Sequence, residues 1–166
     1  MNFPQLTFNE NMGGIESFAF IPWNHVRQLS NPVNGIMKSP PSLHPFREWF
    51  LGYSVKDSLS FEQEMVQTKV GKYWSISLKG IYPNPGDQLP GLFQMLSNYR
   101  FFVICKDRNK RFRFLGYDRF PLDFSFSEKS GQKPSELSGY YFTFSGNIPV
   151  PCLLYDTGNG APIWQM

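Results

Sequence analysis

Alternating apolar and polar positions recur along this chain and predict β-strands over most of its length. The clearest case is residues 59–80, where two alternating runs flank a turn at Gly71 and are expected to form a hairpin. On the second strand Trp74, Ile76 and Leu78 share one face, and mostly polar side chains take the other. That strand is therefore expected to be half buried.

The rest of the chain divides into short strands and turns. A second hairpin is predicted at residues 100–117, with its turn at residues 107–110. Residues 150–155 contain Pro151, which has no N–H to donate, so this strand is expected at a sheet edge or at a bulge. The remaining strands are predicted at residues 15–22, 49–55, 121–126 and 140–145.

One helix is predicted at residues 88–98, where apolar residues recur at helical spacing and Asp87 stands at the capping position. It is expected to cover one sheet. The inward face of each strand follows from the alternation, because a one-residue slip would turn every side chain to the other face. The predicted core comprises Phe18, Phe20, Trp74, Ile76, Leu78, Leu92, Phe93, Leu96, Phe102, Ile104, Phe112, Phe114, Phe142 and Phe144.

These elements predict a mainly β fold over a single domain, residues 1–166: a β-sandwich or partly closed barrel of seven to nine strands with one flanking α-helix. Two segments stand outside the strand pattern, a proline-rich loop at residues 28–45 and a C-terminal tail at residues 156–166. Both carry apolar side chains that gain little from water, so both are expected to dock and become ordered on neighbouring subunits. These candidate interface residues are Val33, Ile36, Met37, Ile163 and Trp164.

Composition narrows the function classes. Hydrophobic residues make up 41% and aromatic residues 17%, which excludes a disordered chain. Charged residues make up only 17%, below the about 25% of ordinary soluble domains, and the net charge is +3, so no bulk attraction to DNA or to an anionic membrane is implied. No apolar run approaches about 18 residues, so no membrane partner is expected, and the first residues lack a secretory pattern, which favours synthesis in a cytoplasm.

Catalytic and metal chemistry find little support in the sequence. The two histidines, His25 and His44, lie at no ligand spacing, so no metal is expected. The chain has no Walker loop and no GxGxxG motif, so no cofactor is expected. Cys105 and Cys152 lie in apolar stretches, which favours free thiols over a disulfide. Residues 156–158 resemble the Asp-Thr-Gly triplet of aspartic proteases, but that chemistry needs a second carboxylate, and the composition favours a turn. The protein is expected not to be an enzyme.

A basic segment at the turn of the second hairpin leaves two interpretations open. Basic and aromatic residues interleave there, as in some strands that bind nucleic acid, and the segment is a candidate contact for DNA or for an acidic partner. The same alternation is typical of a half-buried hairpin strand that binds nothing. The candidate residues are Lys106, Arg108, Lys110, Arg111 and Arg113.

The order of motifs carries a family resemblance. Along the chain, the following segments occur in this order: GGIESFAFIP, a proline-rich insertion, KYWSISLKG, a helix ending in FQMLSNYRFFVICKD, FRFLGYDRFPLDFSF and SGYYFTFSGNIPVPCLLYD. This series resembles small virion proteins of tailed phages and prophages of Bacteroidetes-type hosts, with the tail-tube and tail-completion fold. The resemblance implies a virion location, self-association into a ring or tube, neighbouring virion proteins as partners and passing contact with DNA. Whether the position is tube, neck or connector stays open.

Two further expectations concern assembly. The two regular hairpins, residues 59–80 and 100–117, are predicted to offer the sheet edges that pair with neighbouring subunits. The alternative is a monomeric β-sandwich module that recognises a sugar or a peptide through exposed aromatic side chains, with Trp23, Trp49 and Trp164 as candidates.

Overall fold

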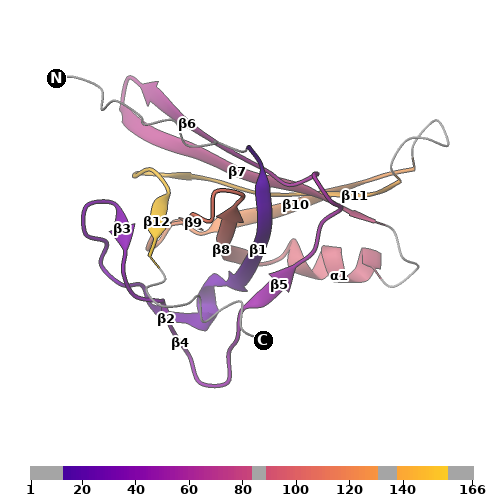
Figure 1. Ribbon diagram of the computed structural model, residues 1–166, viewed down its shortest axis with the longest axis horizontal. Helices are drawn as coiled ribbons and strands as arrows, with labels where there is room; N and C mark the ends of the chain where they lie inside the picture. Colours follow the sequence, from indigo (N-terminus) through magenta and orange to yellow (C-terminus); the bar gives the residue numbers. More distant parts are fainter. Residues whose placement is uncertain (1–12, 84–88, 131–137, 157–166) are drawn as a thin grey trace.

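The computed structural model describes residues 13–83, 89–130 and 138–156 (Figure 1). Strands form most of the described chain, and the expected fold class, mainly β with one flanking helix, is confirmed. The helices are α1 (Leu89–Leu96) and the short 3-10 helix η1 (Trp23–His25). The strands are β1 (Ile15–Pro22), β2 (Val26–Gln28), β3 (Ile36–Met37), β4 (Ser42–Leu43), β5 (Phe50–Gly52), β6 (Ser60–Thr68), β7 (Gly71–Pro83), β8 (Arg100–Asp107), β9 (Phe112–Leu115), β10 (Leu122–Lys129), β11 (Gly139–Ile148) and β12 (Leu153–Tyr155).

The main sheet branches at β8. Along one edge β8 pairs antiparallel with β1, which in turn pairs with β5. The other edge of β8 is shared, because β10 pairs with residues 100–101 and β9 with residues 103–106. One branch continues as β9, β12 and β3, and the other as β10, β11, β7 and β6. Figure 1 shows the four strands of the second branch running together past β1 and β8.

Because of this branching, β8 is buried on both of its faces. Phe101, Val103 and Cys105 point into a first core, which lies against β1 and the long strands β7, β10 and β11. Phe102 and Ile104 point the other way, into a second core between β8, β9, β12 and the segment that carries β2–β4. A strand buried on both faces needs a continuous apolar run, and residues 101–105 are one.

The predicted core is confirmed in most positions and divided between the two cores. Phe18, Ile76, Leu78, Phe142 and Phe144 are buried in the first core with Phe93 of α1. Phe20, Trp74 and Leu96 pack partly buried against it. Phe102, Ile104 and Phe114 are buried in the second core, and Phe112 packs partly buried against these residues.

Leu92 was expected in the core and is exposed to 46%. Phe93 supplies the main contact of α1 with the sheet, stacking on Phe124 and Phe126. Leu92 lies about 100° around the helix from Phe93, and there it faces the mouth of a cavity instead of packed side chains. The prediction failed because helical spacing alone does not tell which side of an apolar stripe the sheet covers.

The loop at residues 28–45 contains more structure than its prolines suggested. Gln28 and Ser42 belong to a small sheet of β2 and β4, and β3 pairs in parallel with β12. Met37, at the end of β3, has no exposed surface and lies in the second core. Met37 is therefore a core residue of its own subunit and offers no exposed interface in this structure.

Two expectations about sheet edges are corrected. The strand after Pro151 is not at an edge, because β12 lies between β9 and β3. Pro151 precedes the paired residues, which begin at Leu153, so its missing N–H is not needed by the sheet. The hairpin of β8 and β9 is also interior, since β8 pairs with three strands and β9 with two. Of the two predicted hairpin edges, only β6 lies at a sheet edge in the described part of the chain.

Candidate functional site

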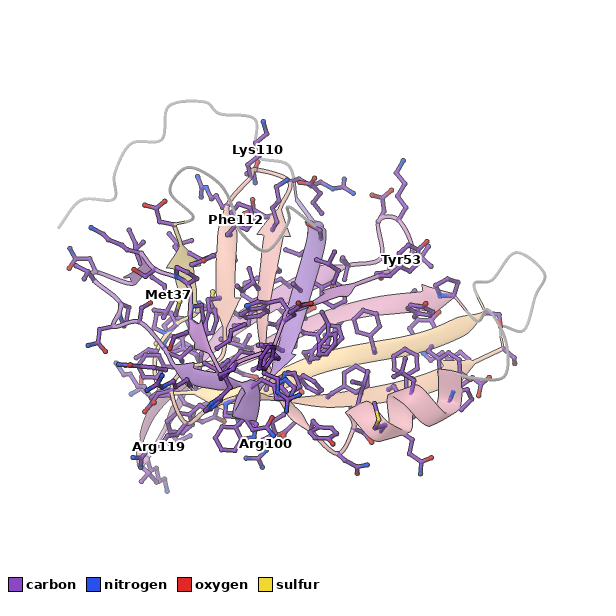
Figure 2. The ribbon with its side chains drawn as sticks, turned by 90° about the horizontal axis from the view of Figure 1, so that it is seen from below. Met37, Tyr53, Arg100, Lys110, Phe112 and Arg119 are labelled. Atoms are coloured by element: carbon purple, nitrogen blue, oxygen red, sulfur yellow. The ribbon has the colours of Figure 1, made fainter. Side chains whose placement is uncertain are left out.

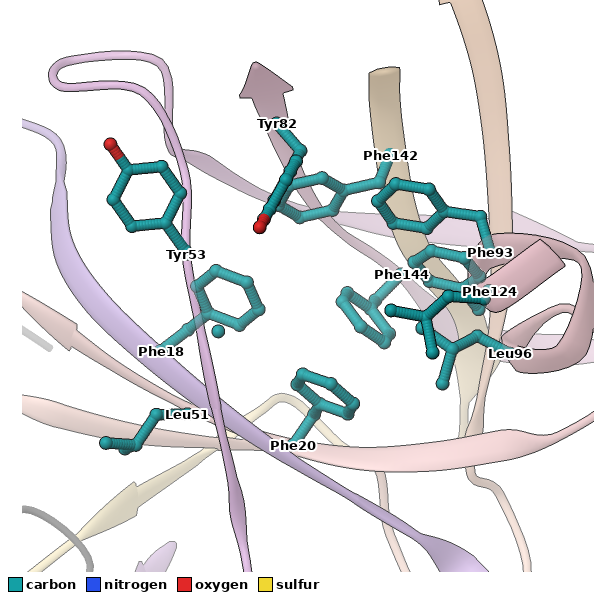
Figure 3. A pocket seen from close by; sticks show the side chains of 12 residues that line it. Phe18, Phe20, Leu51, Tyr53, Tyr82, Phe93, Leu96, Phe124, Phe142 and Phe144 are labelled. Atoms are coloured by element: carbon teal, nitrogen blue, oxygen red, sulfur yellow. The ribbon is translucent and has the colours of Figure 1, made fainter. Parts of the chain in front are cut away.

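The most distinctive surface feature is a pocket lined by aromatic rings, which we call the aromatic groove (Figure 3). It opens between β5 and α1 and has a volume of about 240 Å³. Its floor and walls come from five strands and the helix. The lining residues are Phe18, Phe20, Leu51, Gly52, Tyr53, Tyr82, Leu92, Phe93, Leu96, Phe124, Phe142 and Phe144.

Strand alternation explains how these rings come together. Phe18 and Phe20 lie two residues apart on β1 and therefore point to the same face, as do Phe142 and Phe144 on β11. The two pairs pack against each other, with ring centroids 5.5 Å apart for Phe18 and Phe142 and 5.5 Å apart for Phe20 and Phe144. Such tilted contacts between rings are favourable beyond the apolar area that they bury.

The mouth of the groove combines exposed apolar side chains with an open strand. Leu51 and Tyr53 are exposed to 53% and 59%, and Leu92 lines the groove from α1. Among the described strands, β5 pairs with β1 alone, so its outer backbone edge at residues 50–52 is open. No charged side chain of the described residues lines the groove. An open strand edge beside an apolar pocket is the arrangement that binds an extended peptide by strand addition.

The basic segment of the β8–β9 hairpin is largely neutralised by carboxylates. Lys106 Nζ lies 2.9 Å from Glu16 Oε2, and the Arg108 guanidinium pairs with Asp57. At the turn itself the buried carboxylate of Asp107 accepts a hydrogen bond of 2.8 Å from the backbone N–H of Arg111. The carboxylates of Glu16, Asp57 and Asp107 are thus engaged with groups of their own subunit.

Arg113 is also engaged. Its guanidinium lies 3.7 Å from Asp107 Oδ2 and stands over the ring of Phe61, 5.5 Å from the centroid. Lys110 and Arg111 have no carboxylate partner among the described residues. Of the five candidate contacts for DNA or an acidic partner, these two are the ones that no carboxylate of residues 13–83, 89–130 or 138–156 pairs with.

A second basic surface lies away from this turn. Trp23, Arg100, Arg119 and Pro121 line a depression, with the Trp23 ring exposed to 49%. Figure 2 places Arg100 and Arg119 on the opposite side of the molecule from Lys110. Arg100 is paired with Asp123 at 3.0 Å, which compensates one of the two positive charges of this depression.

The remaining predicted interface residues are scattered. Val33 is exposed, and Ile36 lies half-buried in β3, away from the groove. Ile163 and Trp164 lie outside the described residues, as do Asp87, at the start of the predicted helix, and most of the tail. Trp49, a candidate exposed aromatic residue, instead packs its ring edge-on against Phe114.

The described residues hold no cluster of side chains suited to a metal ion. Cys105 and Cys152 are free thiols, and burial raises the pKa of the Cys105 thiol far above its usual value, with Cys152 nearby adding to the shift. A thiol held in its protonated form is a poor nucleophile. Asp156 is exposed, and its backbone N–H donates to Met37 O at 2.9 Å, while the two residues after it fall outside the described chain.

The outer edge of β6 is the longest open strand edge of the described chain. β6 pairs with β7 over nine residues and with no other described strand. On the exposed face of this strand pair, Lys79 Nζ of β7 donates to Glu62 Oε2 of β6 at 2.6 Å. This hydrogen bond and the lysine charge lower the pKa of the Glu62 carboxyl. Carboxylates on an edge strand oppose indiscriminate pairing, and here one of them is already compensated.

Sequence reasoning missed the aromatic groove. Its rings were predicted as core, and residues 50–53 were predicted as an ordinary strand. The available signal was the consecutive run Phe50, Leu51, Gly52 and Tyr53, because neighbouring residues of a strand point to opposite faces and these apolar side chains cannot all face one core.

Comparison with known proteins assigns no relative to this chain. No protein-family model matches it, and no curated protein and no solved structure shows a significant match. No helix among the described residues is both long enough and apolar enough to cross a bilayer.

Proposed function

We propose that this chain is a non-enzymatic structural subunit of a phage virion, a tail-tube, tail-completion, neck or connector protein that self-assembles into rings or tubes. The order of motifs along the chain supports the virion assignment. The β-rich architecture with one flanking helix is compatible with the fold that this resemblance implies. Assembly itself is supported by the surface of the subunit.

The observation that carries the proposal is the exposed apolar surface around β5 and α1. Phe50, Leu51, Tyr53 and Leu92 are each exposed to between 46% and 59%. Leu51, Tyr53 and Leu92 line the aromatic groove, and the Phe50 ring lies 5.7 Å from that of Phe20, another lining residue. Exposed apolar side chains gathered around one strand and its neighbouring helix favour a protein-protein contact, because a monomer gains nothing by leaving them in water.

The open edge of β6 supplies a second means of association. Its unpaired backbone N–H and C=O groups can continue the sheet into a neighbouring subunit, and a closed ring would satisfy every such edge.

Purified chain should therefore form rings or tubes as its concentration rises, seen by light scattering and electron microscopy. Asp156→Asn should assemble normally, because Asp156 has no catalytic part in this proposal. Glu64→Pro and Met65→Pro test the β6 edge, since successive N–H groups of a strand point to opposite sides. One of the two removes an N–H that faces away from β7; that variant should fold normally and fail to assemble.

A chain that stays monomeric at all concentrations would contradict the proposal. So would a peptidase activity that Asp156→Asn abolishes. If the proline variant that keeps the native unfolding free energy also assembles normally, β6 is not an assembly edge. The second candidate is a monomeric module that binds a peptide in the aromatic groove; a permanently monomeric chain would favour it.

A further inference from the structure

We propose that the aromatic groove is the docking site for the C-terminal segment of a second copy of this chain, which adds its backbone to the open edge of β5 and inserts the Trp164 ring between β5 and α1. This inference rests on the proposed assembly function and names the partner of one of its surfaces. Residues 157–166 lie outside the described structure and contain Ile163 and Trp164.

The shape and volume of the groove fit an aromatic side chain. An apolar cavity of about 150 Å³ is enough to bind benzene, so the roughly 240 Å³ here accommodates a two-ring indole. Phe18, Phe20 and Phe144 present ring faces and edges to the space, as Figure 3 shows. Tryptophan, like tyrosine and arginine, is also enriched among the residues that dominate the binding energy of an interface.

The charge of the two surfaces matches. No charged side chain of the described residues lines the groove, and the segment TGNGAPIWQM at residues 157–166 carries no charged side chain. Docking this segment therefore requires no charged side chain to be buried without a partner, which would oppose binding strongly. The N-terminal residues 1–12 also contain apolar side chains, but they include Glu10.

The position of β12 favours a tail from another copy. Tyr155, the last residue of β12, is buried in the second core, and the N–H of Asp156 is bonded to Met37. The groove opens on the first core, on the other face of the sheet that contains β1 and β8. The described chain thus ends at Asp156 beside the second core, whereas the groove lies at the first core. Exchange of tails between successive copies is head-to-tail and closes into a ring when the rotation permits.

Photo-crosslinking in the full chain tests the docking directly. The variant Trp164→benzoylphenylalanine keeps an aromatic side chain and is prepared in both unlabelled and 15N-labelled form. The two forms are mixed when dilute, concentrated to allow assembly, irradiated and analysed by mass spectrometry. We expect cross-links from position 164 to residues 51–53 or 92–96, with unlabelled and labelled chains joined to each other.

Matched substitutions test the same contact without a cross-linker. Leu92→Glu places a charge at the groove mouth, whereas Met95→Glu places it on the same helix at a residue of similar exposure that does not line the groove. Trp164→Ala removes the proposed anchor, and Trp23→Ala removes an exposed tryptophan elsewhere. Leu92→Glu and Trp164→Ala should weaken self-association by about tenfold or more, while both controls leave it unchanged.

Each contrary outcome has a distinct meaning. Assembly that persists with cross-links to other surfaces, or with an unaltered Leu92→Glu variant, overturns the docking site and leaves the assembly function standing. Cross-links to the groove only within one chain show that the subunit covers its own groove and overturn the proposed exchange. A wild-type chain that stays monomeric, with no cross-link between labelled and unlabelled chains, overturns both.

Discussion

Two glycines bring the aromatic rings of the groove into direct contact with the backbone of neighbouring strands. A Cβ atom at Gly52 on β5 would overlap the ring of Phe18, and one at Gly80 on β7 would lie 2.5 Å from the ring of Phe142. Neither position has a positive φ. The requirement is therefore for space, because a ring lies where a side chain would begin.

Gly52→Ala should destabilise the fold. The added methyl group forces Phe18 out of its position among Phe20, Phe142 and Phe144, and overpacking of this kind costs about 1–3 kcal/mol. Urea unfolding measures the change in the free energy of unfolding. Gly91→Ala is the matched control, because a Cβ there meets nothing within 4 Å and a helix gains about 0.5–1 kcal/mol from the exchange. Equal effects of the two substitutions would contradict the close approach.

Helix α1 depends on the sheet for its existence. It has eight residues, too few for a helix to be stable by itself in water. Phe93 secures it, with its ring centroid 5.2 Å from that of Tyr140 and 5.4 Å from that of Phe126. Leu92, one residue earlier, contributes to the groove instead of to the core.

Phe93→Ala should lower the free energy of unfolding by about 3–5 kcal/mol, because it removes a buried ring and leaves a cavity under the helix. Leu92→Ala should change it by less than about 0.5 kcal/mol, as is usual for exposed positions. Chemical denaturation of both variants makes the comparison. A loss below about 1 kcal/mol for Phe93→Ala would mean that the helix is held by something other than this ring.

The two cores share β8, and we therefore expect them to unfold as one cooperative unit. The odd-numbered residues of β8 serve the first core and its even-numbered residues serve the second, and β1 repeats the arrangement with Phe18 on one side and Ile21 on the other. Unfolding of either core would expose one face of both β1 and β8 to water.

Phe144→Ala in the first core and Phe102→Ala in the second should each lower the free energy of unfolding by about 3–5 kcal/mol. Each variant should still unfold in a single transition, with far-UV and near-UV circular dichroism changing together. A variant in which one core melts before the other, giving two separate transitions, would show that the cores are independent.

The sequence by itself determined the local elements and most inward faces. The alternation around Ile76 and Leu78, and around Phe142 and Phe144, identified strands and core residues, because side-chain direction in a strand repeats every two residues and needs no knowledge of the neighbours. The hairpin of β6 and β7 followed for the same reason, since its partners are adjacent along the chain.

Only the tertiary structure decided which strands are interior, which apolar residues stay exposed and where the groove opens. β12 lies between β9 and β3, Met37 is buried and Leu92 is not, and the groove gathers residues from β1, β5, β7, β10, β11 and α1. Each of these facts depends on pairing between segments far apart in sequence. The alternation along a strand shows which residues share a face, but it does not show which distant strand will cover that face.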